Sequence, residues 1–292
     1  MDWDDLRIFA TVARARQIGR AAAQLGIDPT TAGRRLRRLE KAVGQTLLEQ
    51  RRDGQRLTEA GEALFARAEA VARMLDGVDE GDGETGRGLL RVSASEGFGG
   101  WFVAPRLGDF TAANPGVRVD LVATSGFLSP SRRETDVAIM LARPRRGPVV
   151  TRKLIDYGLG LYAARAYFAD APPADTVTDL RRHPLIGYIP DLMYAPELDY
   201  LDEVEPGLEP ALRSSSIIAQ YRLAEAGAGI AVLPCFIADG DPALMRVLPQ
   251  VAIRRAFWLV VHQDTRAVPR VRRFVEWLTA LAEAERGRLA GR

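Results

Sequence analysis

The sequence predicts a chain with an all-α N-terminal head followed by a larger α/β domain. Three observations lead to this prediction. Apolar residues recur at helical spacing in residues 1–43, and the last of these helical patterns is strongly basic. A heptad pattern and a segment rich in Gly and acidic residues then occupy residues 58–88. From residue 89 onward, short β-rich runs alternate with helical patterns, which indicates a mainly parallel sheet with helices on both faces.

The basic pattern covers Asp28–Val43 and has a well-defined start. Asp28 can accept hydrogen bonds from the free N–H groups of the first turn, and Pro29 suits the first helical position. One stripe of this helix is apolar and must pack against other residues: Ala32, Leu36, Leu39 and Val43. The opposite face, flanked by Gly33 and Arg38, carries hydroxyl and cationic side chains: Thr30, Arg34, Arg37 and Lys41. Such a face suits the major groove of DNA, and a merely solvated charged face is the alternative.

Two shorter helical patterns precede the basic one. They cover Asp4–Ala15 and Gly19–Leu25, and only Gly26-Ile27-Asp28 separates the second of them from the basic helix. A short helix, a tight turn that contains Gly and a longer helix with a polar face make a helix-turn-helix arrangement, whose second helix enters the DNA groove.

The order LRIFATVA, AAAQLGI, TTAGRRLRRLEKAVG and LLEQRRDGQRLTEAGEAL resembles the N-terminal winged helix-turn-helix of LysR-type transcriptional regulators, over about residues 1–65. The chain departs from that family at four positions. Gly19 and Gly33 stand where the family usually has Ser or Thr, and Leu48 and Gln50 stand where it has Phe and Arg. A Gly inside the basic helix costs about 1 kcal/mol relative to Ala. It also removes a hydroxyl group that could contact DNA, so we expect an altered target sequence.

Composition and charge fit this interpretation. A chain of 292 residues with 47% hydrophobic and 27% charged residues is typical of a globular protein of two or three domains. No apolar run approaches the ~20 residues that span a bilayer, and the acidic start MDWDDL differs from a signal peptide, so we expect a cytoplasmic location without membrane contact. The one cysteine, Cys235, excludes a disulfide framework. Residues 1–60 carry a net charge of +4 within a total of +2, which suits a DNA-binding head on a mildly acidic body.

A wing is predicted after the basic helix. Leu47-Leu48 and Arg51–Leu57 indicate two short strands around an Asp-Gly turn. Three arginines of this segment would flank the groove and contact phosphates: Arg51, Arg52 and Arg56. Solvated turn charges are the alternative.

A longer helix follows the wing. Thr58 can cap a helix that runs to about Val78, and four residues mark a heptad seam: Leu64, Ala68, Val71 and Leu75. Packing of this seam on its own domain is an equal alternative. The resemblance implies that the helix pairs two subunits, and one recognition helix alone reads too few bases for specificity, so we expect a homodimer or a homotetramer. Residues 76–88 would form a hinge.

The resemblance also implies the organisation of the larger domain. It predicts two Rossmann-like α/β lobes, similar to a type 2 periplasmic binding protein, with crossovers near Ala163–Arg165 and Thr265–Val268. The expected domains are the winged helix-turn-helix at 1–59, the linker helix and hinge at 60–88, and the effector-binding domain at 89–292. Its first lobe would take residues 89–163 and 268–292, and its second lobe residues 164–267.

Ligands of such sheets bind beyond the carboxyl ends of the strands, between the lobes. Three segments are candidates for contact with a small-molecule effector: Ser95, Glu96 and Gly97; Thr124 and Ser125; Ser214, Ser215 and Ser216. Hydroxyl and N–H groups at a helix start suit an anion, whereas each residue could instead only cap a helix. Glu96 would repel an acidic ligand unless it is neutralised, so a cationic or donor-rich ligand remains open.

Catalytic chemistry is sparse in this sequence. His183, His262 and Cys235 are far apart in the chain and give no zinc spacing, and Gly227-Ala228-Gly229 lacks the rest of a dinucleotide loop. We interpret both histidines as structural or exposed and Cys235 as a core residue. We therefore expect no enzyme activity, no cofactor and no metal.

The sequence thus predicts a LysR-type regulator that binds an inverted-repeat DNA operator and responds to a small-molecule effector, with RNA polymerase as a candidate partner. Base contacts are assigned to Thr30, Thr31 and Arg34, at the start of the helix that Pro29 opens. Phosphate contacts are assigned to Arg37, Arg38, Lys41, Arg51 and Arg52. The alternatives are a small-molecule binding protein with a vestigial DNA-binding head, and an enzyme built on the two lobes.

Overall fold

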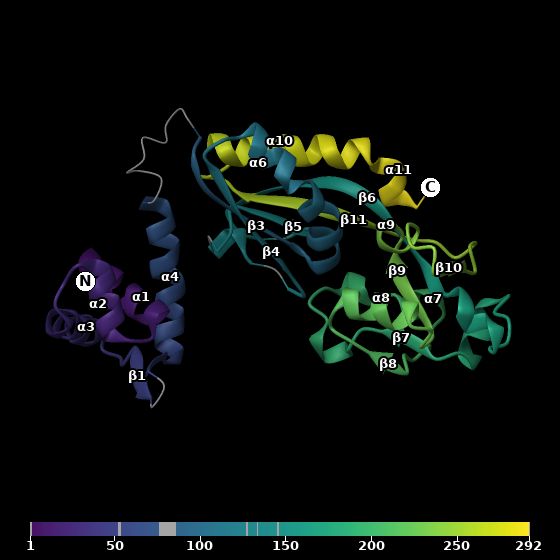
Figure 1. The fold of residues 1–292 in the computed structure, drawn as a ribbon, viewed down its shortest axis with the longest axis horizontal. Helices are drawn as coiled ribbons and strands as arrows, with labels where there is room; N and C mark the ends of the chain where they lie inside the picture. The colour runs from purple at the N-terminus through teal and green to yellow at the C-terminus, as the bar shows by residue number, and fades with distance from the viewer. Residues whose placement is uncertain are drawn as a thin grey trace. The chain divides into compact units, whose positions relative to one another are not determined.

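The computed structural model describes residues 2–51, 54–75, 86–126, 128–132, 134–144 and 146–291. The chain divides into two compact units, Met1–Gly83 (unit 1) and Glu84–Arg292 (unit 2) (Figure 1). Of the hinge expected at residues 76–88, residues 76–85 lie outside the described residues, as does Val78 at the expected end of the long helix.

Unit 1 consists of four helices and a two-stranded wing in its described part. The elements are α1 (Trp3–Ala15), α2 (Ile18–Leu25), α3 (Pro29–Val43), β1 (Leu48–Arg51), β2 (Gly54–Leu57) and α4 (Glu59–Leu75). The apolar stripe predicted for the basic helix packs into the core of this unit, since Ala32, Leu36 and Leu39 are buried. Val43 is half-buried against the same core. The predicted orientation of α3 is confirmed.

Local hydrogen bonds start and end these helices as the sequence predicts. The backbone N–H of Thr30 donates to Asp28 Oδ1 at 2.7 Å, and the side chain and backbone of Thr30 lower the pKa of this carboxyl group. Gly44 ends α3 with a φ of +75°, a conformation that Gly adopts without strain. Thr58 caps α4, because its Oγ1 accepts from the N–H of Gly61 at 3.0 Å.

Unit 2 is built on one sheet, which has nine strands in the described part of the chain. The strands are β3 (Gly88–Ser95), β4 (Val117–Thr124), β5 (Val137–Met140), β6 (Val149–Ala164), β7 (Leu185–Gly187), β8 (Leu212–Arg213), β9 (Ile230–Pro234), β10 (Leu244–Val247) and β11 (Ile253–His262). They lie in the order β4-β3-β5-β11-β6-β9-β7-β8, and β10 pairs with β6.

The sheet is mixed, and the expectation of a mainly parallel sheet is wrong. Strands β3, β4 and β5 pair in parallel, and so do β7, β8 and β9. Between these groups, β6 and β11 run antiparallel to each other and to their outer neighbours. The parallel groups are the cores of a first lobe (β3–β5) and a second lobe (β7–β9). Burial patterns along a strand do not depend on its direction, so the sequence did not reveal the two antiparallel strands.

The two crossovers lie inside strands rather than in the loops that follow them. Strand β6 pairs with β11 over Val149–Leu159 and then with β9 over Leu159–Tyr162, so it passes from the first lobe to the second. Strand β11 returns, since Trp258–Val261 pair with β5 of the first lobe. The crossovers therefore occur earlier than the positions expected near Ala163–Arg165 and Thr265–Val268.

Helices cover the sheet and complete the core. The α-helices of unit 2 are α6 (Leu107–Ala113), α7 (Leu201–Val204), α8 (Ile217–Glu225), α9 (Cys235–Ala238), α10 (Pro269–Ala284) and α11 (Arg286–Ala290), and a π-helix occupies Phe98–Val103. Helices α6 and α10 lie side by side over the first lobe (Figure 1), where the rings of Phe110 and Phe274 are 5.2 Å apart. Cys235 is fully buried, which confirms its place in the core.

Helices of the described segments are all too short or too polar to cross a membrane.

Two glycines of unit 1 differ in the space around them, and this difference generates a prediction. A Cβ atom at Gly33 of α3 would meet nothing within 4 Å, whereas one at Gly54 would meet the carbonyl oxygen of Arg16 at 2.3 Å, with a φ of +126°. Gly33→Ala should stabilise unit 1 by about 1 kcal/mol through helix propensity, and Gly54→Ala should destabilise it. Native-state hydrogen exchange of α1–α3 peptides in the full chain measures both effects. Faster exchange in Gly33→Ala would contradict the assigned environment.

Candidate DNA-binding surface and ligand pockets

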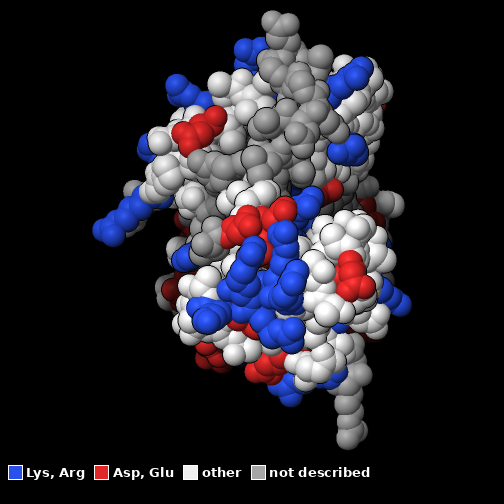
Figure 2. Space-filling view, turned by 90° about the vertical axis from the view of Figure 1, so that its left-hand side faces the viewer, with Lys and Arg blue, Asp and Glu red and all other residues white. Residues whose placement is uncertain are grey.

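The outward side of α3 is a cationic surface. Arg34, Arg37 and Lys41 are exposed, and we call these three residues the basic face. Within the described residues, none of the three has a carboxylate oxygen within ion-pair distance. Figure 2 shows Lys and Arg side chains gathered on one side of unit 1, next to a smaller acidic group. The basic face therefore keeps its charge available for an external anion.

The first turn of α3 supplies small polar groups beside the basic face. Pro29 and Thr30 are exposed, and Thr31 and Gly33 are half-buried. Both the backbone and the side chain of Thr30 contact the Asp28 carboxylate, and Thr30 is exposed, so its hydroxyl lies at the surface next to that carboxylate. Hydroxyl and cationic groups at the N-terminal end of an exposed helix are the types of side chain that contact base edges.

Arg38 has a different position from the basic face. Its Nε and Nη2 donate to the two carboxylate oxygens of Asp5 on α1, both at 2.6 Å, and Nη2 also contacts Asp2 at 3.1 Å. The Asp5 side chain is only 3% exposed, and its hydrogen bonds raise the pKa of the Arg38 guanidinium. Arg35 pairs with Asp4 at 3.2 Å. These two ion pairs hold α3 against α1. The guanidinium group of Arg38, which the sequence analysis assigned to a phosphate contact, therefore already pairs with a carboxylate of its own chain.

The wing arginines differ among themselves. Arg51 pairs with Glu49 of its own strand at 2.6 Å and stays 58% exposed. Arg56 is exposed and has no ion pair within the described residues, and Arg52 lies outside them. The N–H of Gln55 donates to the carbonyl oxygen of Arg16 at 2.7 Å, so the wing is attached to the end of α1.

The expected heptad seam of α4 divides into two parts. Ala68 is 1% exposed and Leu64 packs against the core of unit 1, so these two residues lie against their own chain. Val71 is half-buried, and Leu75 is the last helical residue, with a side chain outside the described ones. Only the C-terminal half of the seam therefore remains as a candidate surface for a second subunit.

Two of the three expected ligand-binding segments meet between the lobes. The Ser216 hydroxyl donates to Glu96 Oε1 at 2.9 Å and accepts from the N–H of Ala219 at 3.1 Å. The other carboxylate oxygen of Glu96, Oε2, is buried without a hydrogen-bond partner. Ser95 and Gly97 line a cavity of about 20 Å³, which we call the interlobe cavity. Glu96 and Ser216 do not themselves line this cavity, and the buried free oxygen of Glu96 suits a partner that donates hydrogen bonds.

The other residues expected to contact a ligand do not line the interlobe cavity. Thr124 is exposed, and its hydroxyl donates to the carbonyl oxygen of Gly126 at 3.0 Å. Ser214 Oγ accepts from the N–H of Ser216 at 3.1 Å. Ser125 and Ser215 are half-buried, and neither lines the interlobe cavity. For Thr124 and Ser214 the geometry matches the alternative of local turn and cap contacts.

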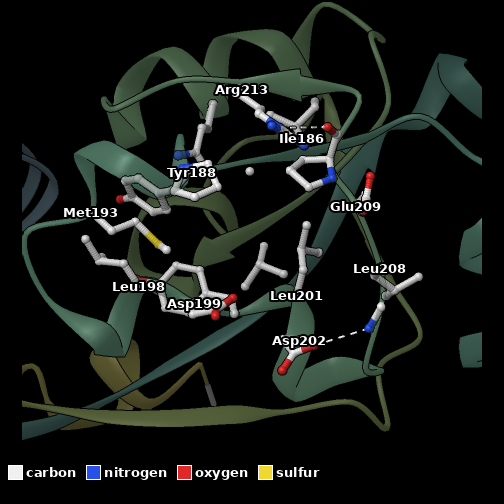
Figure 3. A pocket seen from close by; sticks show the side chains of 17 residues that line it. Ile186, Tyr188, Met193, Leu198, Asp199, Leu201, Asp202, Leu208, Glu209 and Arg213 are labelled. Atoms are coloured by element: carbon white, nitrogen blue, oxygen red, sulfur yellow. Dashed lines mark hydrogen bonds between the residues drawn. The ribbon is translucent and has the colours of Figure 1, made fainter.

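Sequence reasoning missed the aromatic residues of this site. The walls of the interlobe cavity include Tyr157, Tyr188, Tyr194 and Tyr200. Burial raises the pKa of Tyr194 to about 12, and the Glu96 carboxylate adds to this effect. The regular spacing of Tyr188, Tyr194 and Tyr200 along the chain was an available signal. A larger cavity of about 330 Å³ opens in the second lobe (Figure 3) and was also missed.

The two histidines, which were the sparse candidates for catalysis, contact neighbouring groups of the protein. His183 is 6% exposed, its Nδ1 lies 2.9 Å from the Tyr167 hydroxyl, and burial lowers its pKa. His262 Nδ1 accepts from the N–H of Asp264 at 3.2 Å. In the described part of the chain, no group of three His, Cys, Asp or Glu side chains could hold a metal ion.

Two family models match the two units. The model described as the bacterial regulatory helix-turn-helix protein of the lysR family matches residues 3–62. The model described as the LysR substrate binding domain matches residues 83–283. Together they cover most of the chain and correspond to the head and the two-lobed domain that the sequence predicts.

Similar proteins extend over the whole chain. The Mau operon transcriptional activator of Paracoccus denitrificans is 31% identical, and the match covers 96% of this chain and 96% of that protein. The transcriptional regulator PtxR of Pseudomonas aeruginosa is 29% identical, with 99% and 96% covered. The structure of full-length CbnR complexed with its target DNA has a TM-score of 0.67 at 21% identity, over 97% of this chain and 100% of that one. This last likeness concerns the fold, and it confirms the predicted fold class.

The ion pair between α1 and α3 leads to a second prediction. Asp5→Asn removes the charge that Arg38 binds through two hydrogen bonds, so α3 should detach from α1 more often. Glu62→Gln is the control, because Glu62 is an exposed carboxylate of α4 that takes no part in the pairs between α1 and α3. We expect proteolysis of unit 1 in the full-length protein under native conditions to accelerate more in Asp5→Asn than in Glu62→Gln. Equal rates would show that the Asp5 pair does not hold α3.

Proposed function

From the family membership shown above, we propose the role of each unit and of its residues. The chain belongs to the LysR family of bacterial helix-turn-helix proteins and is a DNA-binding transcriptional regulator with a substrate-binding domain. Unit 1 binds an inverted-repeat operator, and unit 2 binds a small-molecule effector that modulates this binding or activation. The observation that carries the proposal is the unpaired basic face of α3 beside two arginines that pair with α1.

We assign base reading to the start of α3 and phosphate contacts to its later turns. Thr30, Thr31 and Arg34 read base edges in the major groove. Arg37 and Lys41 contact phosphates, with Arg51 and Arg56 of the wing on the flank of the groove. Arg38 supports them indirectly, because its pair with Asp5 fixes the orientation of α3. Arg52 keeps its phosphate assignment from the sequence.

Two copies of unit 1 would be needed to read an inverted repeat. We propose that α4 pairs two subunits through its C-terminal half around Val71, since Leu64 and Ala68 pack within their own unit. A homotetramer made of two such dimers is compatible with the same contact. RNA polymerase remains a candidate partner on operator DNA.

We propose that the effector binds between the lobes, where the interlobe cavity of about 20 Å³ must widen to admit it. Glu96 and Ser216 come from different lobes and share a hydrogen bond across the same boundary, so a ligand there contacts both sides of the closure. The unpartnered Glu96 Oε2 favours an effector with hydrogen-bond donors over a simple acid. Such a ligand changes DNA binding only through its different affinities for the open and closed states.

The alternatives receive less support. A vestigial head would have no reason to keep three unpaired cations on one helix face, since they repel one another. The two relatives described above are named as a transcriptional activator and a transcriptional regulator, and we propose that this chain likewise catalyses no reaction and acts in the cytoplasm, on DNA.

The phosphate assignment generates a third prediction. Arg37→Gln should weaken binding to operator and to unrelated duplex by similar factors, because phosphate contacts carry no sequence information. It should also reduce the slope of log K against log salt by about 0.9. Fluorescence anisotropy of the full-length protein at several salt concentrations measures both quantities, with the exposed Arg118→Gln of unit 2 as the control. A loss restricted to the operator would assign Arg37 to base reading instead.

The subunit contact generates a fourth prediction. Val71→Asp places a charge in the proposed α4 contact and should shift the full-length protein from dimer to monomer in analytical ultracentrifugation. Ala66→Asp is the control, because Ala66 is exposed and lies about 140° away around the helix at 100° per residue. A dimer that survives Val71→Asp but not Ala66→Asp would move the contact to the other side of α4.

A further inference from the structure

The second lobe contains a cavity of about 330 Å³ that is distinct from the interlobe cavity, and we call it the second-lobe cavity. This volume lies within the range of small-molecule sites. Its walls come from β7, α7, β8, α8, β9 and the segments between them, and most of them are apolar, among them Tyr188, Met193, Leu198 and Tyr200. The rings of Tyr188 and Tyr200 are 6.0 Å apart and form one wall.

Three carboxylates line this cavity: Asp199, Asp202 and Glu209. They are exposed, and none of them forms an ion pair with another described residue. Asp202 Oδ1 accepts from the N–H of Gly207 at 3.2 Å. The one cation among the described lining residues, Arg213, lies near Ile186 at the opposite end from Asp199 and Asp202 (Figure 3), and its Nε donates to the carbonyl oxygen of Pro210. Arg213 therefore lies away from Asp199 and Asp202.

The amide side chain of Gln220 adds a second, independent observation. Gln220 of α8 is 1% exposed and lines the cavity. Its Nε2 donates to the carbonyl oxygen of Ser214 at 3.1 Å, while Oε1 receives no hydrogen bond from any described residue. This oxygen is not fully buried but open to the cavity, where a ligand or water can supply its donor.

We propose that the second-lobe cavity binds an organic ammonium ion with an apolar body, at a site separate from the effector site between the lobes. The carboxylates and Gln220 Oε1 accept hydrogen bonds from the ammonium group, which has only donors. Tyr188 and Tyr200 offer aromatic faces, which attract cations, and the aliphatic walls enclose the apolar body. An anionic ligand of the same shape would face three carboxylates against one guanidinium.

The second-lobe cavity shares part of its wall with the interlobe cavity, so the two proposed sites can influence each other. Tyr188, Leu198 and Tyr200 line both the second-lobe cavity and the interlobe cavity. A ligand that fixes these side chains on one side constrains the shape of the other cavity. Binding at the second-lobe site thus changes affinity at the interlobe site, and the change is reciprocal.

Calorimetric titration of the full-length protein tests the site, with 2-phenylethylamine as the probe. We expect saturable binding of one molecule per chain. The uncharged 2-phenylethanol should bind about tenfold more weakly, because it lacks the charged hydrogen bonds. The anionic 3-phenylpropanoate should bind more weakly still. Equal affinity for the amine and the alcohol, or no saturable binding of the amine, overturns the proposal.

Variants assign the binding to this cavity. The double variant with Asp199→Asn and Glu209→Gln should lower the affinity for 2-phenylethylamine about tenfold and leave that for 2-phenylethanol unchanged. Asp170→Asn is the matched control, since Asp170 is an exposed carboxylate of the same lobe outside the cavity. An unchanged amine affinity in the double variant overturns the proposal. A loss in Glu96→Gln with full binding in the double variant moves the amine between the lobes and also overturns it.

Methionine signals locate the ligand directly, without reference to DNA binding. Met193 lines the second-lobe cavity, whereas Met140 on β5 and Met245 on β10 do not. In protein labelled with ¹³C at the methionine methyl groups, 2-phenylethylamine should shift the Met193 signal and leave the other two in place. A shift at Met140 or Met245 without one at Met193 contradicts the assignment. Since this readout needs no operator, its failure is distinguishable from failure of the proposed regulatory function.

Discussion

The orientation of α3 on α1 is the constraint on which the DNA-binding surface depends. The apolar side of α3 is buried in the core of unit 1, and the fork of Arg38 on the buried Asp5 holds the adjoining side of the helix. With two sides fixed in this way, the rotation of α3 about its own axis is determined. The remaining side, with Arg34, Arg37 and Lys41, must then face outward. Acidic residues on α1 thus decide which arginines of α3 stay available for DNA.

The wing, like α3, has an ion pair of its own and contacts that attach it to α1. Arg51 pairs with Glu49, and the wing is attached to the end of α1 by a backbone hydrogen bond and by the close approach of Gly54 to Arg16. Because both α3 and the wing are attached to α1, the helix that contributes no residue to the proposed DNA contact positions both elements that do. A protein that reads bases needs this rigidity, since hydrogen bonds to base edges are lost when the reading side chains are displaced.

In unit 2, strands β6 and β11 determine where ligands can bind. They belong to both lobes, so a bending motion of these two strands would open or close the interlobe cavity, where Glu96 and Ser216 meet. The second-lobe cavity lies on the far side of a wall made of Tyr188, Leu198 and Tyr200. The fold therefore places two cavities of different size on either side of one wall, which connects them physically.

The sequence by itself determined the local features of this protein. The cap at Asp28, the buried stripe of Ala32, Leu36 and Leu39, the wing and the alternation of strands and helices follow from contacts between residues a few positions apart, which spacing reveals. Tertiary structure alone decided the rest. Arg34 and Arg38 are one helical turn apart and were both assigned to DNA from the sequence, yet of these two only Arg38 meets Asp5, 33 residues away. Glu96 and Ser216, 120 residues apart, meet only because β6 and β11 join the lobes. Contacts at such separations depend on the direction and order of strands, which a periodic pattern does not record.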